Sequence, residues 1–62
     1  MIITNDIAQK VIIKRSINKM TKTDLASKLN ISTHTLLKIE NGNYKAPRRI
    51  YQSVMNWLVE DL

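Results

Sequence analysis

The sequence predicts an all-α domain of four to five helices, and three observations support this fold class. The 62 residues suffice for one domain, which is expected to span 1–62. Turn-forming residues cluster at 18–21, 30–32 and 41–47 and divide the chain into four helical segments. No segment shows the alternating, β-branched pattern of a hairpin, although residues 1–4 could be extended. A chain this short buries little surface, so its stability is expected to be marginal.

The first helical segment covers residues 5–19 and has apolar residues on two sides. Thr4, Asn5 or Asp6 can cap its start with a side-chain oxygen. The two sides consist of Ile7, Ala8, Val11 and Ile12, and of Ile13 and Ile17 with Met20 just beyond. One small core cannot easily take both sides of a straight helix. We therefore expect one side to be covered by the last helix or by a partner molecule. The candidate partner residues are Ile7, Ile12 and Ile13.

The second helical segment covers residues 22–29. Thr21 is its expected N-cap, and Asp24, three residues later, completes a capping box. Asn30 stands where the following turn needs a left-handed residue, which Asn is among the few non-glycine residues to tolerate.

The third helical segment covers residues 33–41, between Ser32 as N-cap and Gly42, which can adopt a positive φ at little cost. The turn before it is very short, and Ala26 is small where the second and third segments approach most closely. Two short helices that cross steeply over such a turn form a helix-turn-helix pattern, here over about 22–41.

The fourth helical segment covers residues 48–61 and has one clear apolar face. Pro47 cannot extend the preceding helix and suits the entry to a new one. The apolar face consists of Ile50, Tyr51, Val54, Trp57, Leu58 and Leu62, with Met55 at its edge. We interpret this face as core, with Trp57 as its anchor. The sequence leaves open whether the segment is one helix or a helix with a short turn.

The charge indicates an anionic partner. Ten Lys and Arg stand against five Asp and Glu, a net charge of +5. Because Glu60 and Asp61 are two of the five acids, residues 1–59 carry ten positive and three negative charges, or +7. Nucleic acid is the leading class of partner.

The composition argues against an enzyme and against cofactor or metal chemistry. The chain has no cysteine and one histidine, His34, and it lacks paired carboxylates and a glycine-rich phosphate loop. The longest apolar runs, of three residues, are too short for a membrane span or a signal peptide. We expect an intracellular protein, without a membrane or a small-molecule effector as partner.

The helix-turn-helix segment resembles the lambda-repressor/Cro-like (XRE) family. The resemblance rests on T-x-x-D-L-A at 21–26, I-S-x-x-T-L-x-K-I-E-N-G at 31–42, and Pro47 five residues later. It covers about 11–48, over half the chain. It implies a compact helical domain that binds double-stranded DNA in a bacterial or phage regulator, usually as a two-fold dimer on an inverted repeat. The corresponding location is the bacterial cytoplasm.

The family's pattern assigns roles to individual residues, with 33–41 as the recognition helix in the major groove. The residues expected to read bases are Thr33, His34, Thr35 and Lys38. The residues expected to contact phosphates are Lys22, Asn41, Asn43, Lys45 and Arg48. Leu37 is apolar at a normally polar position, and we expect it to contact either a thymine methyl or a neighbouring helix. Arg15 and Glu40 match an ion pair that fixes the first helix to the recognition helix.

The sequence departs from the family at its C-terminal end. Family domains usually continue through two helices after the proline, whereas 15 residues follow Pro47 here. Dimerisation often resides in that region, so the dimer surface is left open. The favoured function is a Cro-like repressor. The alternative is an antirepressor on the same fold, which binds a partner repressor rather than DNA.

Overall fold

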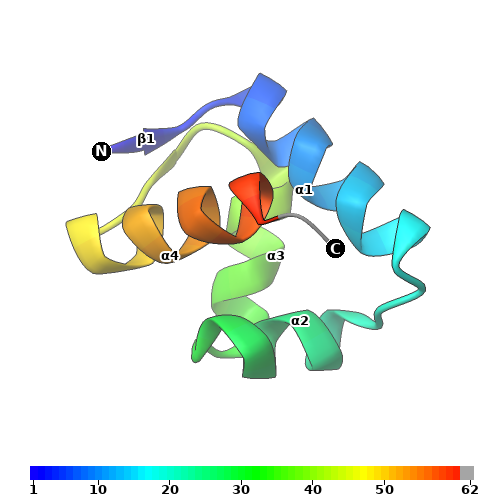
Figure 1. The fold of residues 1–62 in the computed structure, drawn as a ribbon. Coiled ribbons are helices and arrows are strands. Elements are labelled where there is room, and N and C mark those ends of the chain that lie inside the picture. The colour runs from blue at the N-terminus through cyan, green and yellow to red at the C-terminus, as the bar shows by residue number, and fades with distance from the viewer. Residues whose placement is uncertain (61–62) are drawn as a thin grey trace.

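Four helices and one short antiparallel ribbon make up residues 1–60, the part of the chain that the computed structural model describes (Figure 1). The elements are β1 (Ile2–Ile3), α1 (Asn5–Ile17), α2 (Lys22–Leu29), α3 (Thr33–Asn41), β2 (Tyr44–Lys45) and α4 (Arg48–Val59). The mostly helical fold is confirmed, and the fourth segment forms one helix. Its expected end at Asp61, and Leu62 on its apolar face, lie outside the described residues.

The all-α prediction missed the small sheet. Ile2 pairs with Lys45 and Ile3 with Tyr44 in antiparallel register. The ribbon continues for one more pair, because the Ala46 N–H donates to the Met1 carbonyl at 2.7 Å. Each strand has only two residues, too few for alternation to be visible in the sequence. The pairing nevertheless ties the start of the chain to the segment between α3 and α4.

Helix α1 ends two residues before the boundary predicted from the sequence. Lys19 adopts the left-handed conformation, with φ of 56°. Its N–H donates to the Ser16 carbonyl at 3.1 Å, and the Met20 N–H reaches back to the Arg15 carbonyl at 3.0 Å. These two bonds form a Schellman motif, which satisfies carbonyls that the last turn would otherwise leave free. A lysine holds the position that glycine usually fills, so the residue type at position 19 does not mark where the helix ends.

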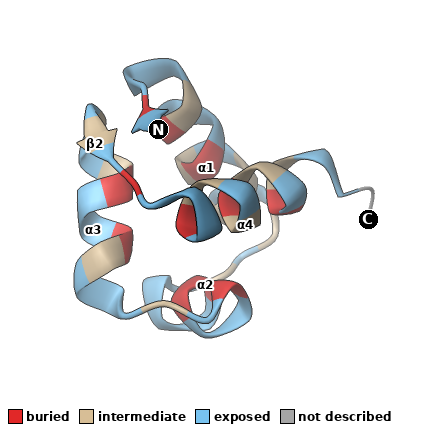
Figure 2. Ribbon diagram, turned by 90° about the vertical axis from the view of Figure 1, so that its left-hand side faces the viewer, coloured by how far each residue is buried: buried red, intermediate tan, exposed pale blue. Residues whose placement is uncertain are grey.

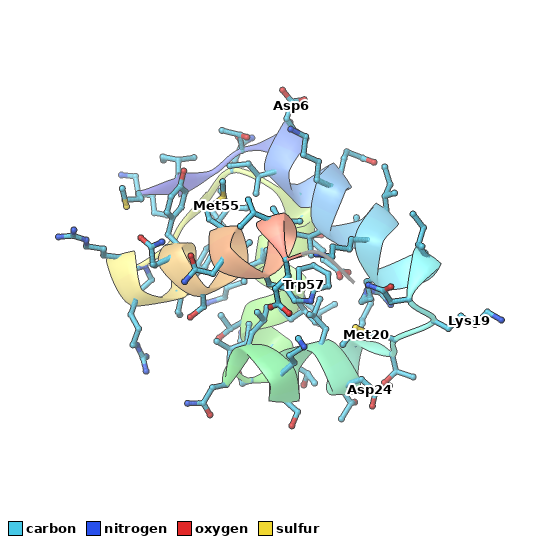
Figure 3. The ribbon with its side chains drawn as sticks, viewed as in Figure 1. Asp6, Lys19, Met20, Asp24, Met55 and Trp57 are labelled. Carbon is cyan, nitrogen blue, oxygen red and sulfur yellow. The ribbon has the colours of Figure 1, made fainter. Side chains whose placement is uncertain are left out.

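Every helix and the first strand contribute to one core. The largest fully buried side chains are Ile3, Val11, Leu25, Leu36, Ile39 and Val54. Trp57 is 2% exposed and points from α4 into the interior, whereas Lys19 projects outward (Figure 3). The expected role of Trp57 as a core anchor is confirmed. None of the helices within residues 1–60 is long and apolar enough to cross a membrane.

Helix α1 leaves one of its two apolar sides uncovered. Ala8 and Val11 are buried in the core, whereas Ile13 is 54% and Ile17 is 73% exposed. The end of α4 lies along another side of α1, where the Lys14 ammonium donates to the carbonyls of Trp57 and Glu60. The expectation that the last helix covers the second apolar side is therefore wrong for the described residues. Met20, grouped with that side from sequence, packs against the core.

Candidate nucleic-acid interface

The orientation of α3 is fixed by the three-residue turn that separates it from α2. Asn30 is left-handed, with φ of 60° and ψ of 45°, as its position predicts. The Ile31 N–H then donates to the Ala26 carbonyl at 2.9 Å, which turns the chain sharply at the end of α2. Ile31 is half-buried against the core and holds the turn in place. The predicted capping box between Thr21 and Asp24 is present at the other end of α2.

Both ends of α3 are defined by specific residues. The Ser32 hydroxyl accepts the Thr35 N–H at 3.1 Å and so caps the first turn. Gly42 closes the helix with φ of +84°. A Cβ at Gly42 would lie 1.9 Å from the Asn5 side-chain oxygen and 3.3 Å from the Asn5 Cα, so a larger residue would require the Asn5 side chain to move away from α3. The sequence signals at both ends therefore also set how α3 sits against α1.

Helix α3 has a buried side and an outward side. Leu36 and Ile39 are fully buried, and Figure 2 shows the buried residues of α3 turned toward α4 along one edge of the molecule. The outward side carries exposed residues at helical spacing, namely Thr33, His34, Leu37, Lys38 and Asn41. This surface is a ridge rather than a cleft. Two hollows, of about 300 and 180 Å³, lie along α2 and α4, and no α3 residue lines either of them.

The structure separates Thr35 from the other residues expected to read bases. Thr33, His34 and Lys38 are exposed, whereas Thr35 is half-buried. The Thr35 hydroxyl also lies 2.9 Å from the Ser32 hydroxyl, as part of the cap. Thr35 is therefore at the flank of the ridge, and its hydroxyl is already engaged.

The residues expected to contact phosphates are all exposed and come from five places in the fold. Lys22 is the first residue of α2, Asn41 the last of α3, and Arg48 the first of α4. Asn43 lies in the loop, with φ of 53°, and Lys45 lies in β2. Only the start of α2 and the segment from α3 to α4 supply them, so they border the α2–α3 pair.

Most of the cations near α3 form no ion pair within residues 1–60. The two ion pairs among residues 1–60 join Arg15 to Glu40 and Lys28 to Glu60. Asp24 accepts the Thr21 N–H. The cations outside these pairs include Lys22, Lys38, Lys45, Arg48 and Arg49. Four of these five lie on α3, β2 and the start of α4, so this region presents uncompensated positive charge.

The start of α4 adds to this positive region. Its N-cap is Pro47, which makes no side-chain cap hydrogen bond, and no acidic residue lies in the first turn. Arg48 and Arg49 stand there instead, next to the positive end of the helix dipole. This arrangement costs some helix stability and favours a nearby anion. Arg49 was not among the phosphate contacts expected from the sequence.

Arg15 and Glu40 meet, as the resemblance implied. The Arg15 Nε donates to Glu40 Oε2 at 2.8 Å, and an Nη donates to Oε1 at 3.5 Å. The other Nη donates to the Met20 carbonyl at 3.2 Å. The side chains are 17% and 8% exposed. The guanidinium thus fixes α1, the α1–α2 loop and α3 relative to one another, and it holds the ridge in one orientation.

The candidate partner residues of α1 fall into different environments. Ile7 is half-buried and packs against the core, and Ile12 is also half-buried. Only Ile13 is exposed, beside Ile17 one turn later. An apolar contact surface on α1 would therefore centre on Ile13 and Ile17.

Comparison of the chain with protein-family models, with curated proteins and with solved structures gives no match. The function is therefore inferred from the residues and their arrangement.

Proposed function

We propose that this protein binds double-stranded DNA sequence-specifically and acts as a transcriptional regulator, most simply a Cro-like repressor. Helices α2 and α3 form its helix-turn-helix unit, and α3 is the recognition helix. The observation that carries the proposal is the outward side of α3. It presents hydrogen-bonding side chains and Lys38 on a ridge whose other side is locked into the core.

The dimensions of α3 suit the major groove. An α-helix with its side chains is about 10–12 Å in diameter, and the major groove is about 12 Å wide. A helix that enters this groove presents its N-terminal residues to base edges, and here these are Thr33 and His34. Lys38 follows one turn after His34 on the same side. Lys can donate to guanine O6 and N7, and His and Thr can donate or accept.

The charges around α3 suit the DNA backbone. Lys22, Lys45 and Arg48 flank the α2–α3 unit and form no ion pair within residues 1–60. Phosphate contacts of this kind fix the register of a protein on the duplex, whereas base contacts supply the specificity. Two copies on an inverted repeat would place two α3 helices about 34 Å apart, on successive turns of the major groove.

The proposal is tested by selection from a library of duplexes with a random core. The wild-type protein should enrich an inverted repeat, and Lys38→Ala should enrich a different or degenerate base at one position of each half-site. Lys10→Ala, which removes the same charge from an exposed position on α1, is the matched control and should enrich the wild-type sequence. If the duplexes that the wild-type protein selects share no common sequence, specific binding would be contradicted.

A second candidate function is binding of a partner repressor instead of DNA, as an antirepressor. The observation that favours it is the adjacent pair Ile13 and Ile17, which are 54% and 73% exposed. Monomers seldom leave contiguous apolar patches exposed without a use. On this alternative, Ile13→Glu would abolish capture of the repressor. The wild-type protein alone would show no preference among duplexes.

A further inference from the structure

Leu37 is the one large apolar side chain on the outward side of α3. It is 42% exposed, while Leu36 and Ile39 on the other side are fully buried. Its neighbours on the helix surface are polar, with His34 one turn before it and Asn41 one turn after it. The position is therefore at the centre of the ridge and not at its margin.

The surroundings of Leu37 do not suit a protein contact. Contiguous apolar patches mark protein-docking surfaces, and the neighbours of Leu37 on α3 are polar or charged. The other exposed large apolar residues of the described chain lie on other elements, at Met1, Ile2, Ile13, Ile17 and Val59. A single apolar side chain among hydrogen-bonding neighbours fits a partner that offers one small apolar group among polar ones.

The major groove offers such a group. Its base edges carry hydrogen-bond donors and acceptors, and the thymine C5-methyl is the apolar exception. A leucine pressed against guanine, adenine or cytosine would strip water from a polar edge and offer no hydrogen bond in return, which is costly. Against thymine it would remove two apolar surfaces from water together. A leucine at this place in the groove would therefore both favour thymine and disfavour the other three bases.

We propose that Leu37 is a specificity-determining residue that selects thymine through its C5-methyl group. The proposal rests on the proposed function, since it requires α3 to lie in the major groove.

The test removes the methyl group and nothing else. After a duplex has been selected with the wild-type protein, each thymine is replaced in turn by deoxyuridine, and the dissociation constants are compared. For the wild-type protein, one thymine in each half-site should be sensitive, with a loss of about fourfold, the worth of one buried methyl group. Leu37→Ala should bind the thymine and deoxyuridine duplexes equally at that position. Val59→Ala, which shortens an exposed apolar side chain on α4, should keep the wild-type profile.

Two results would overturn the inference while leaving specific DNA binding intact. One is a wild-type protein that is insensitive to every deoxyuridine in the selected duplex. The other is Leu37→Ala with the same sensitive position as wild type. If no duplex is enriched at all, the proposed function fails and this inference fails with it. Because Leu37 is exposed, its truncation should leave the helical circular dichroism and the unfolding midpoint unchanged, which shows that any change in binding is local.

Discussion

Replacing Arg15 by methionine tests how α3 is held. The change removes the guanidinium and leaves the Glu40 carboxylate, whose side chain is 8% exposed, without its cation. It also removes the donor to the Met20 carbonyl. Breaking a buried pair by deleting one partner costs about 3–5 kcal/mol. Arg15 is 17% exposed, so water can reach part of the site and we expect the lower end, about 3 kcal/mol.

A loss of this size would be large for so small a domain. At about 0.05–0.15 kcal/mol per residue, a 62-residue chain is stable by only about 3–9 kcal/mol. Arg15→Met should therefore shift the urea midpoint strongly or leave the protein partly unfolded. Glu40→Leu removes the stranded charge. The free energy of unfolding of the double variant Arg15→Met, Glu40→Leu should therefore be about 2 kcal/mol higher than that of Arg15→Met alone. Equilibrium urea unfolding of the wild type, both single variants and the double variant measures this coupling.

The second ion pair supplies the matched control. Lys28 and Glu60 lie 3.7 Å apart, and their side chains are 44% and 47% exposed. Solvent screens such a pair, so Lys28→Met should cost no more than about 1 kcal/mol. Strictly additive losses for Arg15→Met and Glu40→Leu would refute the reasoning, because two side chains that contact each other must show coupling.

Three further predictions follow from the geometry of α1 and α3. His34→Ala should change which base is preferred at one position, with a change in discrimination between bases of about 1–3 kcal/mol. Lys45→Ala should instead weaken binding to all duplexes alike. Base-by-base affinity profiles measure both effects. Gly42→Ala should cost about 1–3 kcal/mol in urea unfolding, because its φ of +84° excludes side chains and the new Cβ would collide with the first residue of α1. Ile13→Glu should change stability by less than about 0.5 kcal/mol, whereas Ile7→Glu should cost about 2 kcal/mol, because Ile7 packs on the core.

Each of these has a contrary outcome. If the profile of His34→Ala matched wild type after uniform scaling, α3 would not read bases at that residue. A Gly42→Ala variant as stable as wild type would mean that the Asn5 side chain moves aside and that the positive φ at position 42 costs little. If Ile13→Glu cost as much stability as Ile7→Glu is expected to cost, both sides of α1 would be buried.

The sequence predicted best the features that depend on neighbouring residues. The capping box of Thr21 and Asp24, the left-handed Asn30 and the Ser32 cap each need only a few residues of context, and all are present. The end of α1 was harder to predict, because Lys19 takes a left-handed conformation that its residue type does not signal.

Features that depend on distant residues were harder to predict. The ribbon joins Ile2 to Lys45, and two-residue strands carry no readable periodicity. The choice of the buried side of α1 is also a tertiary matter, yet one signal was present in the sequence. Arg15 follows Val11 by four residues and so lies on the same side of the helix. Its expected partner, Glu40, is on α3, and this side must therefore face the core.

The most direct test of DNA reading by α3 is the affinity for the selected duplex and for a scrambled duplex of equal composition, measured across a salt series. Three flanking cations in each of two copies, Lys22, Lys45 and Arg48, predict a slope of log K against log salt of about −5. The selected duplex should remain bound at least about a thousandfold more tightly than the scrambled one throughout. Equal affinities for the two duplexes at every salt concentration would contradict the account.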